Sequence, residues 1–248
     1  MMLRSTLCEL IGTFALTFIG AGAILTSTLT GGQPDLLGIA LAHALVLSIV
    51  VSATMNISGG HINPAVSIAM CITGRQKPGD TVCYVIAQCL GAVLAGLLLE
   101  LIFRNIALGR PYVVTGLEAI TTSKLGTPNF GPNITTTTAV IVEIALTFLL
   151  VFAIFGTAVD PRAPRIGGFG IGLTVGVDIL MGGPITGAAM NPARTLGPLL
   201  AGGSATADLW AQHWVYWVGP VLGAVLAAVL YDRLILRPDS TPAAPTER

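Results

Sequence analysis

Six long stretches of apolar residues divide the sequence, with short polar or glycine-rich segments between them. Each stretch has about 20 residues, the length at which an α-helix crosses the hydrocarbon core of a bilayer. None shows the strict alternation of apolar and polar residues that a membrane β-barrel would need, so helices are the spanning structure that satisfies the backbone. We therefore expect an all-α membrane protein whose six transmembrane helices lie at roughly 8–28, 36–56, 82–103, 137–158, 166–183 and 213–235.

The composition supports a membrane protein and excludes several functions. Of the 248 residues, 53% are hydrophobic and 10% are charged, whereas an ordinary soluble domain has about 25% charged residues. Twelve Lys and Arg balance twelve Asp and Glu, so the chain has no basic surface for nucleic acid. The three histidines and four cysteines lack the spacing of metal ligands. We expect no enzyme, no metal and no cofactor.

The distribution of Lys and Arg predicts the orientation of the helices. With the N-terminus inside, most of these residues fall in cytoplasmic segments, as the positive-inside rule requires. We expect a multi-pass integral protein of the cell (inner or plasma) membrane with both termini in the cytoplasm, and a disordered tail at 238–248. The predicted cytoplasmic set is Arg4, Arg75, Lys77, Arg162, Arg165, Arg233, Arg237 and Arg248, and the outer set is Arg104, Arg110 and Lys124.

A short motif occurs twice, at matching places in the two halves of the chain. Asn63-Pro64-Ala65 follows the second span and Asn191-Pro192-Ala193 follows the fifth. Each opens about ten apolar residues, enough for a helix that reaches halfway across the bilayer. A second pair, Glu9 and Glu143, stands early in spans one and four. Each half holds three spans, an odd number, so the copies must face opposite ways. We expect an inverted repeat of residues 1–125 and 126–237, each with three transmembrane helices and one re-entrant half-helix.

The chemistry of Asn-Pro-Ala suits the start of a helix. Proline costs nothing in the first turn, and asparagine before it is a good N-cap with part of its amide free. Two inverted half-helices would meet N-terminus to N-terminus, so one spot would receive two positive dipole ends and two amide donors. That spot suits a neutral acceptor or an anion and repels protons and cations. A single copy would more simply be a capped turn, but two inverted copies favour a pore.

Two other classes of membrane protein are alternatives. A secondary transporter also uses inverted repeats and broken helices, but it needs a site with exchangeable charge and room to rock. The short half-helices and paired asparagines favour a fixed pore instead. A membrane enzyme would need a nucleophile with its base, or metal ligands, and His43, His61 and His213 do not have that spacing.

The sequence resembles the aquaporin (major intrinsic protein) family up to about residue 237. The likeness rests on Ser-Gly-Gly-His-Ile-Asn-Pro-Ala-Val at 58–66, on Gly-Ala-Ala-Met-Asn-Pro-Ala-Arg at 187–194, and on shorter matches at 9–14, 87–92 and 214–220. The resemblance implies a homotetramer in the lipid bilayer with one pore per subunit for water and small neutral solutes. The loop at 159–165 looks more like that of microbial water channels than of animal ones.

The resemblance also implies which residues select the solute. Carried over residue by residue, the family's constriction falls on His43, Ile179, Ala188 and Arg194. This quartet looks like that of plant tonoplast intrinsic proteins, which pass water and often ammonia. The expected function is a passive channel for water and also ammonia that excludes protons and ions. A broader channel for glycerol or urea is the alternative, but such channels favour an Asp after the arginine, where this chain has Thr195.

The family resemblance gives the remaining candidates supporting roles. Glu9 and Glu143 would accept hydrogen bonds from the loop backbone that precedes each half-helix rather than relay protons. His61 would line the cytoplasmic vestibule rather than bind a metal. The backbone carbonyls expected along the pore are those of Gly59, Gly60, His61, Gly187 and Ala189.

Asp178 departs from the family pattern, which has a small residue just before the constriction position in span five. One residue of helix is a turn of about 100°, so Asp178 should point beside the pore rather than into it. Its partner is open at this point among His213, the loop 104–135 and a neighbouring subunit.

Overall fold

The structure, a computed structural model, describes residues 2–164 and 166–236. The predicted tail at 238–248 and three of the predicted cytoplasmic cations, Arg165, Arg237 and Arg248, therefore lie outside the described residues. Within those ranges six helices are long and apolar enough to cross a membrane, as the hydropathy pattern predicts, and no β-strand occurs. The helices are α1 (Met2–Leu29), α2 (Leu36–Ser58), α4 (Pro78–Arg104), α6 (Thr136–Ile154), α7 (Phe169–Thr186) and α9 (Val215–Leu230).

The expected and observed spans differ at their ends. Helix α1 begins at Met2 rather than near residue 8, and α4 begins at Pro78 rather than near residue 82. Helical hydrogen bonds continue through polar residues at these ends, whereas hydropathy marks only the part that hydrocarbon would cover. The fifth span begins later than expected, at Phe169, because Gly167 before it takes a left-handed backbone (φ +58°) that stops helix extension.

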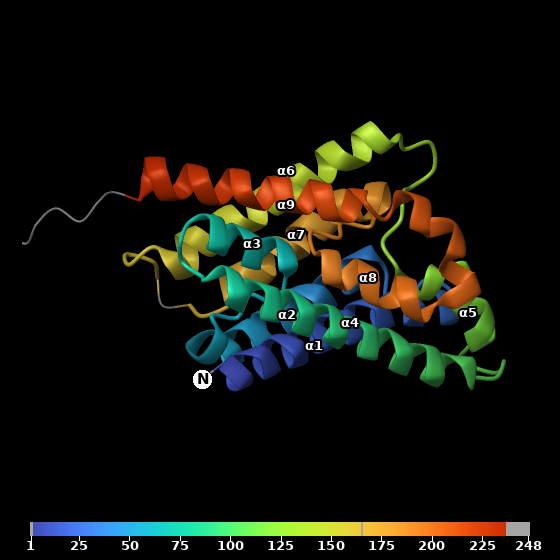
Figure 1. The fold of residues 1–248 in the computed structure, drawn as a ribbon. Helices are drawn as coiled ribbons and strands as arrows, with labels where there is room; N and C mark the ends of the chain where they lie inside the picture. Colours follow the sequence, from blue (N-terminus) through green and yellow to red (C-terminus); the bar gives the residue numbers. More distant parts are fainter. Residues whose placement is uncertain (1, 165, 237–248) are drawn as a thin grey trace, which may run out of the picture.

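Two half-helices, α3 (Pro64–Ile72) and α8 (Pro192–Ala201), lie between the long helices and begin near one another (Figure 1). Each begins at the proline of its Asn-Pro-Ala motif, so the expectation of two re-entrant helices holds in the structure. The remaining short elements are α5 (Gly116–Thr122), η1 (Lys124–Gly126), η2 (Phe155–Val159), η3 (Gly203–Gln212) and η4 (Tyr231–Ile235).

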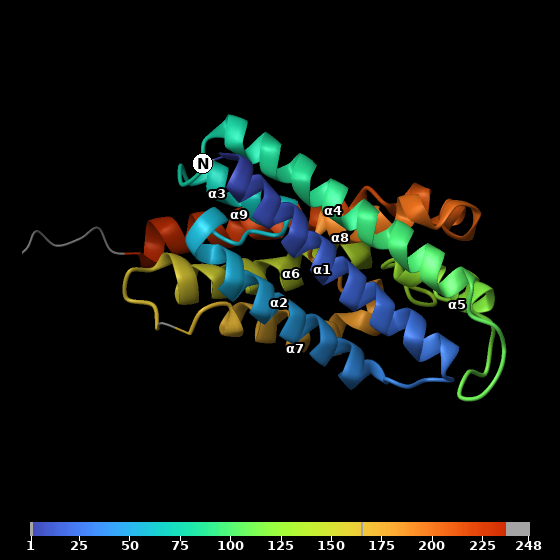
Figure 2. The same ribbon diagram turned by 90° about the horizontal axis from the view of Figure 1, so that it is seen from below.

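The long helices pack in two matching groups. In the first half α1 packs against α2 and α4, in the second half α6 packs against α7 and α9, and α2 meets α7 across the halves (Figures 1 and 2). Close helix contacts match as well. A Cβ built on Gly91 would lie 2.2 Å from the carbonyl oxygen of Leu10, and one on Gly223 would lie 2.2 Å from that of Ile144. Only glycine permits these two approaches.

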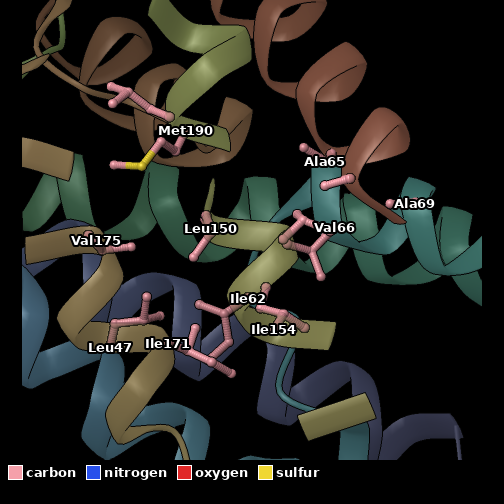
Figure 3. Packing of buried hydrophobic residues seen from close by; sticks show 14 of the residues in the cluster. Leu47, Ile62, Ala65, Val66, Ala69, Leu150, Ile154, Ile171, Val175 and Met190 are labelled. Carbon is pink, nitrogen blue, oxygen red and sulfur yellow. The ribbon is translucent and has the colours of Figure 1, made fainter. Parts of the chain in front are cut away.

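The apolar side chains divide between the outside of the bundle and its centre. Large apolar residues such as Ile49 (66% exposed) and Ile141 (60% exposed) cover the outer surface, as expected for helices in contact with lipid. A buried cluster surrounds the starts of the half-helices; Figure 3 shows Val66, Leu150 and Ile171 in it.

Both ends of the described chain lie at the same end of the bundle, as Figure 1 shows for α1 and the last turn after α9. We name this end the inner face, following the predicted orientation, and the opposite end the outer face.

Candidate pore

The two motif asparagines fix the half-helices to one another. In α3, Oδ1 of Asn63 accepts a hydrogen bond from the backbone N–H of Ala65 (2.9 Å), and Nδ2 donates to the carbonyl of Met190 (2.8 Å). Asn191 caps α8 in the same way, and its Nδ2 donates to the carbonyl of Ile62 (2.9 Å). The sequence predicts that part of each amide is free for the solute; in the structure one N–H of each amide joins the two loops. The other N–H is available to the space between them.

The loops before the half-helices contain unusual backbone. Ile62 (φ 55°), Ala188 (φ 44°) and Met190 (φ 52°) all take the left-handed conformation that side chains disfavour. Such residues persist where the surrounding structure over-determines them. Here the cross bonds from the asparagines hold the carbonyls of Ile62 and Met190.

Two buried acids satisfy the backbone of these loops. In the first half, Glu9 accepts from the backbone N–H groups of His61 (3.0 Å) and Ile62 (2.5 Å) and from the hydroxyl of Ser58 (2.7 Å). Glu143 makes the equivalent bonds in the second half, from the hydroxyl of Thr186 (2.7 Å), the backbone of Ala189 (3.0 Å) and that of Met190 (2.8 Å). Both acids are fully buried, and every bond that they accept fixes a loop or its supporting helix.

A narrow central cavity of about 30 Å³ lies where the half-helices meet. A water molecule needs about 10–15 Å³ of such space, so the cavity admits a row of roughly two water molecules. Asn63 and Asn191 line it, and apolar side chains from both halves form most of the remaining wall. The predicted pore residues that line it are His43, Gly60, His61, Asn63, Ile179, Ala188, Ala189, Asn191 and Arg194.

The outer end of the central cavity is a polar neck, which we define by His43, Ile179, Ala188 and Arg194. His43 and Ile179 also line a wider outer vestibule of about 430 Å³, together with Gly187, so they stand between the two spaces. All four neck residues are at least 95% buried. The structure therefore brings together the quartet that the sequence singled out.

Hydrogen bonds hold the cation of this neck in place. Arg194 donates from Nη1 to the carbonyl of Gly126 (2.8 Å), and its Nη2 lies 3.4 Å from Nε2 of His43. Nδ1 of His43 lies 2.9 Å from the carbonyl of Ile39, which can only accept, so Nδ1 carries the proton and Nε2 is free to accept from the guanidinium. A Cβ on Gly20 would lie 2.2 Å from the His43 ring, so this glycine makes the space that the ring fills.

The inner end of the central cavity opens into a vestibule of about 190 Å³. Gly59, Gly60 and His61, three of the residues expected along the pore, line this vestibule. His61 is held by Ser67, whose hydroxyl lies 3.1 Å from Nδ1, and it meets the ring of Tyr84 edge-on. Among the described residues no group of three potential metal ligands occurs.

Sequence reasoning missed three contributors to the pore. The carbonyl of Gly126 comes from the loop between the halves, and the hydroxyls of Tyr84 and Tyr216 donate to the carbonyls of Ser58 and Thr186 at the same distance, 2.8 Å. The two tyrosines occupy equivalent places in the two halves, so a full alignment of the halves would have found them. Gly126 carries no such signal, because a glycine in a loop is ordinary.

Asp178 lies beside the pore, as expected: it is buried but does not line the central cavity. Its Oδ2 has no hydrogen-bond partner among the described residues. Of its proposed partners, His213 instead accepts a hydrogen bond from Nε1 of Trp217 (3.1 Å). Burial lowers the pKa of His213, so this ring stays neutral near pH 7 and offers no charge to a carboxylate.

The inner loop after η2 is held by an ion pair. Arg162 donates to Oδ1 and Oδ2 of Asp160 (2.9 and 2.6 Å), and Tyr231 contacts the same carboxylate. The hydrogen bonds from Arg162 hold the pKa of the Asp160 carboxyl well below its usual range.

Comparison with known proteins decides the family of this chain. The sequence pattern of the family described as "Major intrinsic protein" matches residues 1–231. The chain belongs to the major intrinsic protein family. This major intrinsic protein is thus a member of a family of channels and not an enzyme, as the sequence predicts.

The relatives extend over nearly the whole major intrinsic protein. It is 43% identical to "Aquaporin TIP4-4" of Zea mays, over 94% of this chain and 87% of that protein. It is 40% identical to "Probable aquaporin TIP3-2" of Arabidopsis thaliana, over 94% and 84%. The crystal structure of the aquaglyceroporin from Plasmodium falciparum matches with a TM-score of 0.79 and 26% identity, over 95% of this chain and 97% of that one. The resemblance of loop 159–165 to microbial channels stays a prediction.

Proposed function

We propose that this major intrinsic protein is a passive water channel that excludes protons and ions and also passes ammonia. The observation that carries the proposal is the narrow cavity between two vestibules, with Asn63 and Asn191 as donors at its centre and Arg194 at its outer end. A fixed row of donors replaces the hydrogen bonds that water loses when it leaves bulk solvent. The relatives named as aquaporins support the same function.

Exclusion of ions follows from the charges that face the row. Half-helices α3 and α8 point their N-termini, and hence their positive dipole ends, at the same place. Arg194 adds a buried cation at the polar neck. Cations and hydrated protons are therefore repelled at both places, whereas neutral water and ammonia are not.

Ammonia permeation rests on the polar neck. Ammonia accepts one hydrogen bond and donates weakly, so it loses less than water beside an apolar wall. Ile179 supplies such a wall, while His43 and Arg194 offer polar groups on other sides of the neck. One hydrogen bond gained or lost is worth about 0.5–1.5 kcal/mol, or about two- to tenfold in relative flux.

A glycerol or urea channel is the second candidate, because the structural neighbour from Plasmodium falciparum is an aquaglyceroporin. In this chain the polar neck contains the ring of His43 and the branched side chain of Ile179 beside Arg194. The bulk of these side chains favours the smaller solutes.

Osmotic shrinkage of proteoliposomes tests the water channel. Purified protein should raise the water permeability well above that of empty liposomes while glycerol and urea fluxes stay near background and the proton leak is unchanged. Water permeability equal to that of empty liposomes, at verified incorporation, contradicts the proposal. Large glycerol flux would favour the second candidate instead.

Ammonia flux is measured in the same vesicles with an enclosed pH dye after addition of an ammonium salt. Alkalinisation faster than in empty liposomes supports the proposal. Ammonia flux at the level of empty liposomes, with water flux well above it, would contradict ammonia permeation and leave a channel that passes water alone.

The assembly and location are proposals as well. We propose a homotetramer with one pore per subunit and both termini in the cytoplasm; mass measurement in detergent and protease protection of tagged termini test these two points. The predicted location in the plasma membrane gains no support from the relatives, whose names mark them as the TIP type. The integral, multi-pass character agrees with the family match and with the six apolar helices among the described residues.

A further inference from the structure

The residues of the polar neck have counterparts in the other half of the chain. The two motif asparagines are 128 residues apart, and the segments before them match without a gap. At this spacing His43 corresponds to Ile171, and Ile179 corresponds to Val51. Ala188 corresponds to Gly60, and Arg194 corresponds to Val66.

These four counterparts form a second neck. Val51, Gly60, Val66 and Ile171, here named the apolar neck, line both the central cavity and the inner vestibule, so they stand where the two spaces join. The residues come from α2, the loop before α3, α3 itself and α7. Figure 3 shows Val66 and Ile171 with Ile154 of α6 in the same cluster. The three apolar side chains of the neck are at least 96% buried.

The two necks differ in what they offer a solute. The polar neck has a guanidinium with several N–H donors and an imidazole. The apolar neck has no side-chain donor or acceptor among its four residues, so its own polar groups are backbone. His61 and Ile154 line both spaces as well, and the His61 imidazole, whose Nδ1 is already in contact with the hydroxyl of Ser67, is the one polar side chain at this junction. A water molecule that passes the apolar neck therefore regains fewer hydrogen bonds than at the polar neck. Ammonia makes fewer and weaker hydrogen bonds in bulk water and loses less at the same place.

We propose that the apolar neck is a second specificity-determining site, which limits the passage of water and thereby raises the ratio of ammonia to water permeability. The proposal rests on the proposed function, because it requires that both solutes pass through this pore. Discrimination then has two parts: Arg194 and the half-helix dipoles reject charge, and the apolar neck adjusts the balance between two neutral solutes.

Substitution of valine by threonine tests the site with little change in shape, because one methyl group becomes a hydroxyl. Val66→Thr and Val51→Thr each place a hydrogen-bonding group in the apolar neck. The matched control is Val151→Thr, because Val151 is buried in the same cluster but lines neither the central cavity nor a vestibule. Osmotic water permeability and ammonia flux are measured for each variant in proteoliposomes and divided by the amount of incorporated protein.

The expected result is a rise of about two- to tenfold in water permeability for Val66→Thr, the effect of one added hydrogen bond. Ammonia flux should change less, so that the ammonia-to-water ratio falls, and Val51→Thr should act in the same direction. Val151→Thr should leave the ratio at the wild-type value. An unchanged ratio in both neck variants, or an equal fall in the control, overturns the inference.

Failure of this inference is distinguishable from failure of the proposed function. If wild-type protein moves neither water nor ammonia, the proposed function is wrong. If wild-type protein moves both and the neck variants keep the wild-type ratio, only the apolar neck is wrong. A neck variant that does not incorporate is replaced by the other one, since Val51 and Val66 come from different helices.

Discussion

At the starts of α3 and α8 the same set of bonds occurs twice. Each half has a capping asparagine that reaches the opposite loop, a buried glutamate that accepts from two loop N–H groups, and a tyrosine that donates 2.8 Å to the carbonyl of the residue before the glycine turn. The residues that face the solute differ between the halves: Arg194 corresponds to Val66, and His43 corresponds to Ile171. The supporting bonds are alike because both loops must be held. The pore-facing residues differ, which permits one neck to reject charge and the other to present an apolar wall.

A second difference lies behind the loops. In the first half Gln88 donates from Nε2 to Glu9 (2.8 Å) and to Ser67 (3.0 Å). The equivalent position in the second half is Pro220, which has no side-chain donor. Glu143 therefore accepts three side-chain or loop bonds where Glu9 accepts four.

The largest expected effect comes from placing a thiol at the polar neck. Ala188→Cys should make water flux sensitive to mercurials, with near-complete inhibition, because Ala188 lines the central cavity and a mercury adduct there fills it. Wild-type protein should resist, because Cys8, Cys71, Cys83 and Cys89 line neither that cavity nor its vestibules. Osmotic shrinkage before and after mercurial addition measures both. Strong inhibition of the wild type that disappears when Cys71 is replaced would place the pore nearer to α3 than the structure does.

Arg194→Val removes the main difference between the necks, since valine is the residue at the matching position. We expect urea flux and proton leak to rise about 10- to 100-fold, because hydrogen bonds to charged groups are worth about 1.5–3 kcal/mol and the buried cation is gone. Solute uptake and proton leak are measured in the same vesicles. Wild-type values for both would show that Arg194 does not select at this neck.

Exchanging the two walls of the polar neck should change the preference between neutral solutes. The double variant His43→Phe with Ile179→His places the polar group on the other wall, so the ammonia-to-water ratio should fall about two- to tenfold. Ile179→Leu is the control, because it keeps an apolar wall and should keep the ratio. An unchanged ratio in the double variant contradicts the proposed basis of ammonia permeation.

The smallest expected effect concerns the buried acids. Glu9→Gln and Glu143→Gln both lose acceptors for loop N–H groups, but a flipped Gln88 amide can accept from the new amide at position 9. Pro220 cannot do this at the equivalent place. Glu143→Gln should therefore lower the free energy of unfolding more than Glu9→Gln, by about one hydrogen bond, 0.5–1.5 kcal/mol.

Thermal unfolding of the two purified variants in detergent compares them directly. The matched control combines Glu9→Gln with Gln88→Leu. This double variant should lose as much free energy of unfolding as Glu143→Gln does. A larger loss for Glu9→Gln than for Glu143→Gln would contradict the role of Gln88.

How much the sequence predicts depends on the range of each contact. Hydropathy predicts six spans because it reports contact with lipid, and Asn-Pro-Ala predicts both half-helices because capping acts within three residues. The bond from Arg194 to Gly126 depends on a loop path with left-handed Lys124 and Leu125 (φ 53° and 52°), which no local pattern indicates. The bond of Gln88 to Glu9 joins residues 79 positions apart and is hidden in an apolar span.

The central claim is that water crosses in a narrow row through the cavity between the two necks. Its most direct test is the ratio of osmotic to tracer-diffusive water permeability, both measured on one preparation of wild-type proteoliposomes and corrected for lipid. Molecules in a row move together under an osmotic gradient but exchange singly by diffusion, so the account predicts a ratio well above unity. A ratio of unity, with water flux above that of empty liposomes, would contradict it.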